Sequence, residues 1–320
     1  MRFFRLLVTF ALISILSSHG ASADTPYWRL STDGLTVISN GSAKRCEKLA
    51  SQFLVFQQFL RDLAQLDQDS SFAPLTVYSL SNSDASQVFL TEADKKQQAA
   101  QNMRIYSKYL PGSDTNIAAI VDIGGSDEPL QSVLLIYARS VLQTGPGRGF
   151  PAWYVIGVSD ITNGLVIRDD GSTLLSREAS FKPVVDKSVR AKYDLAALLS
   201  ATYKDLAGGG TWEEFSNRAR AWAQYGLLTT ADRRAHYREL AVLMRQGTPA
   251  AEAVSQSFGL ALPEVAKDFE DERWRHDAVF KIPPPKTLPT VPPAQALDPA
   301  LVKAALQVVA DRAAQQPLNH

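Results

Sequence analysis

The sequence predicts an α+β fold, with a small N-terminal part of strands and one long helix followed by a mostly helical half. Two observations carry this prediction. Strand-like runs, rich in β-branched and aromatic residues and bounded by turn signals, are concentrated before residue 124. After residue 186, apolar residues recur at helical spacing through five consecutive segments that are separated by short breaks.

The first 23 residues are typical of a secretory leader. Arg2 and Arg5 form a short basic region, and residues 6–16 are apolar but too few to span a bilayer. The triplet Ala-Ser-Ala at 21–23 is a small-x-small cleavage signal. We therefore expect cleavage near Ala23 and a mature chain outside the cytoplasm, periplasmic or secreted. An uncleaved N-terminal anchor is the alternative.

The composition is that of an ordinary globular protein. Without Arg2 and Arg5, 31 basic residues face 33 acidic ones, so nothing favours nucleic acid or an anionic membrane surface as a partner. No later run has the length of a transmembrane segment. Cys46 is the single cysteine, which excludes an intramolecular disulfide, and its helical apolar surroundings predict that it is packed in the core.

The N-terminal part begins with a predicted β-hairpin over residues 28–39. Asp33-Gly34 supplies the turn, because glycine adopts the positive φ that tight hairpin turns require. Residues 42–66 predict a long amphipathic helix with Ser42 as its N-cap. The other elements predicted before residue 124 are a strand at 75–80, a short helix at 84–90 and a strand at 117–123.

The central and C-terminal elements follow from periodicity and breaks. A helix over 129–142 is joined by the glycine-rich linker 144–149 to a second helix that opens at Pro151. Residues 165–167 and 173–175 predict another hairpin. Five helices complete the array, at 188–206, 211–228, 230–245, 249–258 and 263–275, and Thr211 with Glu214 predicts a capping box at the second of these.

We expect four parts along the chain: a leader at 1–23, a main domain at 24–280, a proline-rich linker at 281–298 and a short amphipathic helix or tail at 299–320. The proline-rich linker favours extended backbone. The final helix has three options that the sequence leaves open: it docks on the domain, pairs with a partner, or remains a frayed tail.

Two segments carry a resemblance to a known family. Residues 132–143 read S-V-L-L-I-Y-A-R-S-V-L-Q, and residues 151–160 read P-A-W-Y-V-I-G-V-S-D. Further on, 218–228 and 247–259 follow as two helical segments in the same order as in that family. From residue 28 to about 275 the chain resembles the peptidase MA-like domains of gluzincin zinc metallopeptidases.

The resemblance implies a degenerate active site. Active relatives place H-E-x-x-H on the first helix and a glutamate on the second, giving three zinc ligands and a general base. In this frame Leu135 and Arg139 stand at the two histidines, Ile136 at the base and Ile156 at the third ligand. None of these side chains can perform the family's chemistry. Asp160 is the acidic residue of the frame that survives, and a family tyrosine aligns with Arg218.

We therefore expect a pseudo-peptidase without metal, cofactor or catalytic residue, which acts as a binding or scaffold module for a peptide, glycan or protein. The alternative is a hydrolase with a rebuilt, metal-independent site in the former cleft. His236, His276 and His320 lie far apart in sequence, and no G-x-S-x-G motif is present. His236 is expected to be a solvated residue on a helix surface.

Two aromatic clusters have a structural and a functional interpretation. In the structural one, Trp153-Tyr154 anchors the core and residues 104–109 form a surface strand or loop. In the functional one, Arg104, Tyr106, Lys108 and Tyr109 join Trp153 and Tyr154 along a groove, with Arg139 as a carboxylate clamp. A third interpretation pairs Arg139 with Asp160 as an ion bridge that replaces the metal.

Overall fold

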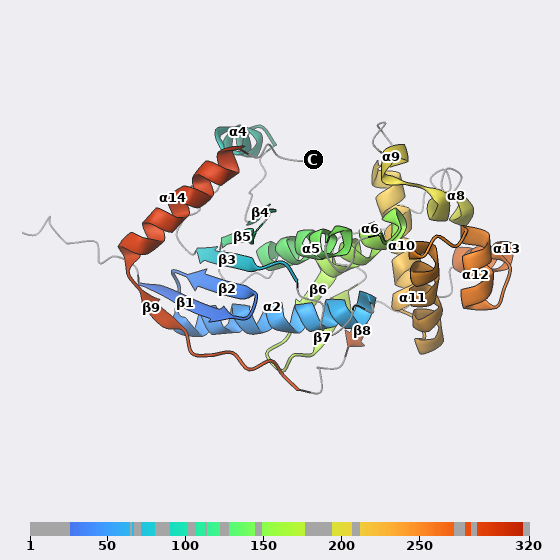
Figure 1. Ribbon diagram of the computed structural model, residues 1–320, viewed down its shortest axis with the longest axis horizontal. Helices are drawn as coiled ribbons and strands as arrows, with labels where there is room; N and C mark the ends of the chain where they lie inside the picture. The colour runs from blue at the N-terminus through green and yellow to red at the C-terminus, as the bar shows by residue number, and fades with distance from the viewer. Residues whose placement is uncertain are drawn as a thin grey trace, which may run out of the picture.

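The computed structural model of the protein describes residues 26–64, 66, 72–80, 90–101, 107–112, 114–121, 128–144, 149–176, 194–206, 212–271, 279–282 and 287–315. The fold is α+β, as predicted: a sheet with its covering helices lies beside an array of helices (Figure 1). Among the described residues, no helix combines the length and apolar character that crossing a membrane requires.

The predicted N-terminal hairpin and long helix are confirmed. Strands β1 (Tyr27–Thr32) and β2 (Leu35–Ser39) pair antiparallel around Gly34, whose φ of 72° is the left-handed conformation that glycine adopts at no steric cost. Helix α2 (Ala43–Ala64) follows, and the Ser42 hydroxyl accepts a hydrogen bond from the Arg45 amide at 3.1 Å. Cys46 of α2 is fully buried.

A six-stranded mixed sheet has the order β4-β5-β3-β2-β1-β9. Strands β2, β3 (Leu75–Leu80) and β5 (Asn116–Val121) run parallel, whereas β4 (Ser107–Leu110) and β9 (Gln295–Leu297) add antiparallel edges. Because side chains alternate along a strand, Val77 and Tyr78 belong to two different cores on opposite faces of the sheet.

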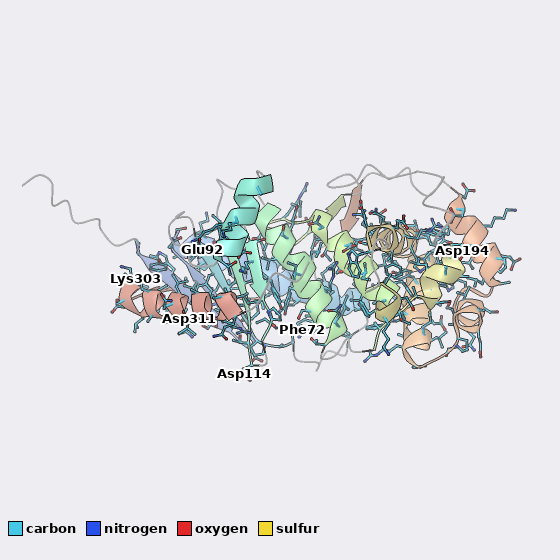
Figure 2. All side chains as sticks on the ribbon, turned by 90° about the horizontal axis from the view of Figure 1, so that it is seen from above. Phe72, Glu92, Asp114, Asp194, Lys303 and Asp311 are labelled. Carbon is cyan, nitrogen blue, oxygen red and sulfur yellow. The ribbon has the colours of Figure 1, made fainter. Side chains whose placement is uncertain are left out.

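Each face of the sheet is covered by its own helices. The larger core joins one face to α2 and to helix α5 (Glu128–Gln143). The smaller core joins the other face to α14 (Pro299–Gln315) through Val302, Leu306, Val309 and Ala313. Figure 2 shows α14 on the sheet, with Lys303 and Asp311 marking its course. Of the three options for the C-terminal helix, the structure shows the first: the helix docks on the domain.

Helix α6 (Ala152–Ile161) follows α5 and leads through the 3₁₀ turn Thr162–Gly164 into a second sheet. This sheet has three antiparallel strands, β6 (Leu165–Ile167), β7 (Thr173–Ser176) and β8 (Val279–Ile282). The predicted hairpin is thus present, and a strand from far along the chain completes it.

The helical half comprises α8 (Leu195–Ser200), α9 (Tyr203–Leu206), α10 (Trp212–Leu227), α11 (Ala231–Arg245), α12 (Ala250–Phe258) and α13 (Leu262–Glu270). The prediction of one helix through 188–206 is wrong within the described residues. Ala201 is extended, with ψ of 138°, and Thr202 starts a new helix because its amide and hydroxyl both donate to Asp205.

Two elements were not predicted, and several predictions concern residues outside the described part of the chain. Helix α4 (Glu92–Gln101) and the edge strand β9 were missed, the first because it has no apolar stripe and the second because prolines flank it. The leader at 1–23, the short helix at 84–90 apart from Leu90, the loop 145–148, Thr211, His276 and His320 lie outside the described residues.

Candidate functional site

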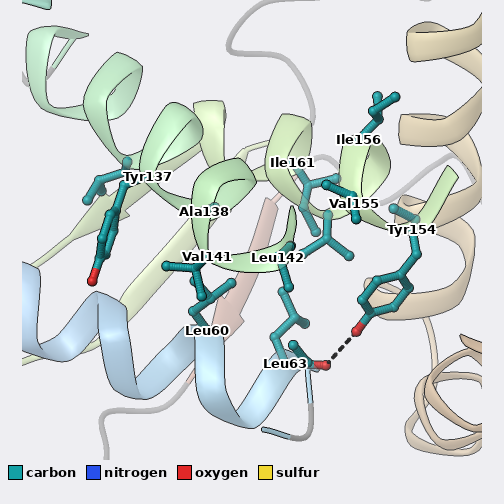
Figure 3. Close-up of a cluster of buried hydrophobic side chains, with 14 of the residues drawn as sticks. Leu60, Leu63, Tyr137, Ala138, Val141, Leu142, Tyr154, Val155, Ile156 and Ile161 are labelled. Atoms are coloured by element: carbon teal, nitrogen blue, oxygen red, sulfur yellow. Dashed lines mark hydrogen bonds between the residues drawn. The ribbon is translucent and has the colours of Figure 1, made fainter. Parts of the chain in front are cut away.

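Helix α5 contributes its less buried face to the candidate site. Its other face packs against α2 in the cluster drawn in Figure 3, which includes Leu60, Leu63, Tyr137, Val141 and Leu142. The helical repeat therefore turns Ile136 and Arg139 outward. Ile136 is 39% exposed, Leu135 is half-buried and the Arg139 side chain is 27% exposed.

Helix α6 is buried along its whole length. Ile156, which the resemblance set at a third-ligand position, has no exposed surface, and Trp153 and Tyr154 are 0% and 1% exposed. The Tyr154 hydroxyl donates to the Leu63 carbonyl at 3.2 Å, which ties α6 to α2 (Figure 3). Trp153 and Tyr154 are thus core anchors, and the interpretation that they line a groove is wrong.

An ion pair joins α5 to α6. Arg139 Nη2 lies 2.7 Å from Asp160 Oδ1, and Arg139 Nε donates to Ser159 Oγ at 3.4 Å. The second carboxylate oxygen of Asp160 accepts a hydrogen bond from the Ser216 hydroxyl of α10. One aspartate therefore links three helices. The ion-bridge interpretation expected the Arg139–Asp160 pair but not the bond to Ser216.

The electrostatics of this ion pair follow from burial and from a second cation. Burial raises the pKa of the Asp160 carboxyl above its ordinary value of 3.8, although Arg139, Ser216 and Arg220 oppose the shift. Burial also lowers the pKa of Arg220 to about 10, and the charge of Asp160 opposes that shift. The charges of Arg139 and Arg220 thus both favour the ionised carboxylate of Asp160.

Three exposed side chains lie on the helix that carries Arg139 and on two helices that contact it, and we call them the rim: Ile136, Tyr203 and Trp212. They are 39%, 38% and 41% exposed. The Trp212 ring centroid lies 5.8 Å from Arg139 Cζ, and the Tyr203 hydroxyl accepts a hydrogen bond from Gln143 Nε2 at 3.2 Å. The rim therefore combines contributions from α5, α9 and α10.

The part of the site on α10 was missed by sequence reasoning. Trp212, Ser216 and Arg220 recur at intervals of four residues, so they share one helix face. The spacing can be read from the sequence, but the sequence does not show that this face of α10 contacts Asp160 of α6 and Arg139 of α5. Arg218, the position at which the resemblance expected a family tyrosine, lies on another side of α10. It pairs with Glu270, and its guanidinium lies 4.3 Å from the Phe269 ring centroid.

The described members of the cluster at 104–109 have structural roles. Lys108 Nζ lies 2.7 Å from Asp94 Oδ2 in a buried ion pair, and the Tyr109 ring packs 6.4 Å from that of Tyr137. Lys108 and Tyr109 therefore do not line a groove. Arg104 and Tyr106 lie outside the described residues.

His236 differs from its predicted environment. It is half-buried on α11, and its ring lies 5.3 Å from that of Phe258, whereas a solvated position was expected. Within the described part of the chain, no three or more His, Cys, Asp or Glu side chains gather as a group able to hold a metal ion.

Comparison of the sequence with known proteins gives no assignment: no family and no curated protein matches this chain.

Proposed function

We propose that this chain is an exported, non-catalytic pseudo-metallopeptidase domain that acts as a binding or scaffold module. The Arg139–Asp160 ion pair is the observation that carries the proposal. In the gluzincin frame Arg139 stands where active relatives have a metal-binding histidine, and a permanently charged guanidinium cannot ligate a cation. The apolar Leu135 and Ile136 beside it supply neither a lone pair nor a base.

The scaffold part of the proposal rests on how the helices are held together. In active relatives the metal connects the two site helices. Here Asp160 makes that connection through Arg139, and Ser216 extends it to α10. This cross-link holds α5, α6 and α10 together without a metal, which supports a scaffold role.

The binding part of the proposal rests on the rim. Trp, Tyr and Arg are the residue types that dominate the energy of protein interfaces. Here the Trp212 ring lies beside Arg139, and Tyr203 contacts Gln143, one turn further along α5. Large apolar side chains exposed as a group indicate an interaction surface. Among a peptide, a glycan and a protein, an extended peptide is the partner that we would test first.

The proposal is tested with a defined mixture of unstructured peptides, incubated with residues 24–320 and separated by ultrafiltration. Mass spectrometry then identifies both retained peptides and new fragments. We expect intact peptides to be retained, and Trp212→Ala to reduce the retained amount about tenfold, because it removes an aromatic anchor. Fragments that persist with a chelator would instead favour the hydrolase with a rebuilt site.

Zinc provides the second arm of the experiment. We expect the purified protein to contain no stoichiometric zinc and its thermal midpoint to stay unchanged on zinc titration, because the frame positions hold no ligands. One equivalent of zinc that raises the midpoint would contradict the proposal, since a ligand that binds the native state stabilises it.

A further inference from the structure

The C-terminal end of helix α2 is contacted by an arginine that keeps most of its hydrogen-bonding capacity. The Leu63 carbonyl oxygen, which accepts the Tyr154 hydroxyl of α6 (Figure 3), also accepts a hydrogen bond from Arg238 Nε of α11 at 3.1 Å. The Nη atoms of Arg238 have no hydrogen bond to a described residue. This half-buried guanidinium group is therefore held in place by one bond while its Nη–H donors remain available.

A second arginine lies one helical turn away on the same face of α11. Arg234 precedes Arg238 by four residues, a spacing at which side chains of a helix are neighbours. Arg234 is also half-buried, and its Nη1 lies 3.5 Å from the Leu227 carbonyl oxygen at the end of α10. Two guanidinium groups thus lie next to each other, and each contacts a backbone carbonyl at the end of another helix.

This pair of like charges has little compensation within the described part of the chain. Neither Arg234 nor Arg238 forms an ion pair with a described carboxylate. Burial lowers the pKa of Arg238, the charge of Arg234 lowers it further, and Asp62 opposes the shift least of the groups that act on it. Asp62 is exposed, and its Oδ1 accepts from Gln58. Because partial burial and mutual repulsion both disfavour the two cations, an added anion would stabilise them.

The number of donors defines the kind of anion that fits. A carboxylate has two oxygens and is matched by the edge of one guanidinium group. A phosphomonoester has three terminal oxygens, so it can accept hydrogen bonds from two guanidinium groups at once. Its charge of about −1.5 to −2 at neutral pH also matches two cations. The exposed charge of Asp62 is screened by solvent and offsets this attraction only in part.

We propose that Arg234 and Arg238 form a binding site for a phosphomonoester group beside the end of α2. The Nη–H donors of both side chains bind its oxygens, while Arg238 Nε stays on the Leu63 carbonyl. A soluble phosphomonoester and the headgroup of phosphatidic acid share this chemistry. The site uses no residue of the rim, so the inference is independent of the proposed function.

The first arm of the experiment titrates inorganic phosphate into residues 24–320 and follows the thermal midpoint, with ionic strength held constant by sodium chloride. We expect a saturable rise, because a ligand that binds the native state stabilises it. Half-saturation should need at least about tenfold less phosphate than acetate, since acetate engages one guanidinium group. Equal concentrations would overturn the inference, and so would a rise without saturation, which is a general salt effect.

Variants show whether the two arginines are responsible. Arg234→Gln and Arg238→Gln should each raise the half-saturating phosphate concentration about tenfold, because each removes charge-assisted donors. Arg234→Gln leaves the bond from Arg238 to Leu63 intact, so it tests the inference even where Arg238→Gln is unstable. Arg168→Gln, at an exposed arginine between β6 and β7, is the matched control and should change nothing. An unchanged phosphate response in Arg234→Gln would overturn the inference.

Vesicles distinguish the two sources of the phosphate group. Sedimentation of the protein is compared with phosphatidylcholine vesicles that contain or lack phosphatidic acid. Capture that requires phosphatidic acid and both arginines would assign the site to a lipid headgroup. A saturable phosphate response without capture would assign it to a soluble phosphomonoester. Absence of both effects would overturn the inference, and the retention experiment with the peptide mixture judges the proposed function separately.

Discussion

Asp94 illustrates how a single buried carboxylate can organise an edge of the sheet. Its carboxylate accepts hydrogen bonds from the Thr91 amide and from Lys108 Nζ, both at 2.7 Å, and its own amide donates to the Thr91 hydroxyl. Burial opposes ionisation, but the hydrogen bonds from Lys108 and Thr91 outweigh it and the pKa of Asp94 lies below its ordinary value of 3.8. The pair ties the start of α4 to β4.

Asp94→Asn should change how stability depends on pH. A carboxyl whose folded pKa is lowered contributes stability that is present above its unfolded pKa and is lost as pH falls through the folded value. The difference in unfolding free energy between the native protein and the variant should therefore be largest near neutral pH and shrink below about pH 4. Urea denaturation from pH 7 to pH 2.5 measures it.

The exposed Glu239→Gln on α11 is the control for this prediction and should give a small difference at every pH. A difference for Asp94→Asn that stays constant with pH would mean that its charge does not contribute.

At the candidate site, only residues within the two segments that resemble the family could be singled out from the sequence. Arg139 and Asp160 were singled out from their positions on two successive helices. Tyr203, Ser216 and Arg220 were not, because their roles depend on which face of α10 or α9 meets α5 and α6 in the fold. Trp153 and Tyr154 had two interpretations, which burial alone could separate.

At the scale of elements, the contact between α6 and α10 depends on one glycine. A Cβ atom added at Gly157 would lie 2.4 Å from the Ala219 carbonyl oxygen of α10, inside the limit of van der Waals contact. The helix backbones therefore approach closely at this point, which helps Asp160 to reach Ser216.

Gly157→Ala should destabilise the protein by about 1–3 kcal/mol, the usual range for overpacking a core. Helix propensity alone has the opposite sign, because alanine favours a helix interior by about 0.5–1 kcal/mol over glycine. Chemical denaturation measures the change. Gly41→Ala, where an added Cβ would have 3.4 Å to its nearest neighbour, is the matched control and should be close to neutral. A stabilised Gly157→Ala protein would show that the helices separate easily.

The boundaries of most elements could be predicted because their apolar residues recur with the period of a helix or strand, on the face that packs in the core. The elements that escaped prediction lack that signal. Helix α4 has no large apolar residue and is fixed by the Asp94–Lys108 ion pair. Strand β9 has three residues that pair with β1 from far along the chain. Their formation depends on tertiary contacts that no local window contains.

For the whole molecule, the C-terminal arm formed by β9 and α14 completes the sheet. Leu306 of α14 is 4% exposed and packs in the smaller core against the sheet. Leu301 on the same helix is 65% exposed. The arm therefore belongs to the folded body, and its inner and outer faces should respond differently to mutation.

Leu306→Ala should lower the free energy of unfolding by about 2–5 kcal/mol, because it leaves a cavity between α14 and the sheet. Leu301→Ala should change it by less than about 0.5 kcal/mol. Denaturation measures both, and hydrogen exchange should show the loss of protection in β1 and β9 first. Equal effects of the two substitutions would mean that α14 is not packed as described.

The pairing of β1 with β9 also sets an order of events during synthesis. Tyr27 lies opposite Leu297, so about 270 residues separate the two sides of one strand pair. At a synthesis rate of roughly 5–20 residues per second, β1 waits roughly 15–50 s for the strand that covers its edge. Until then it is an open edge on which another chain can pair. The late arrival of a three-residue strand thus decides how long the nascent protein is exposed to wrong partners.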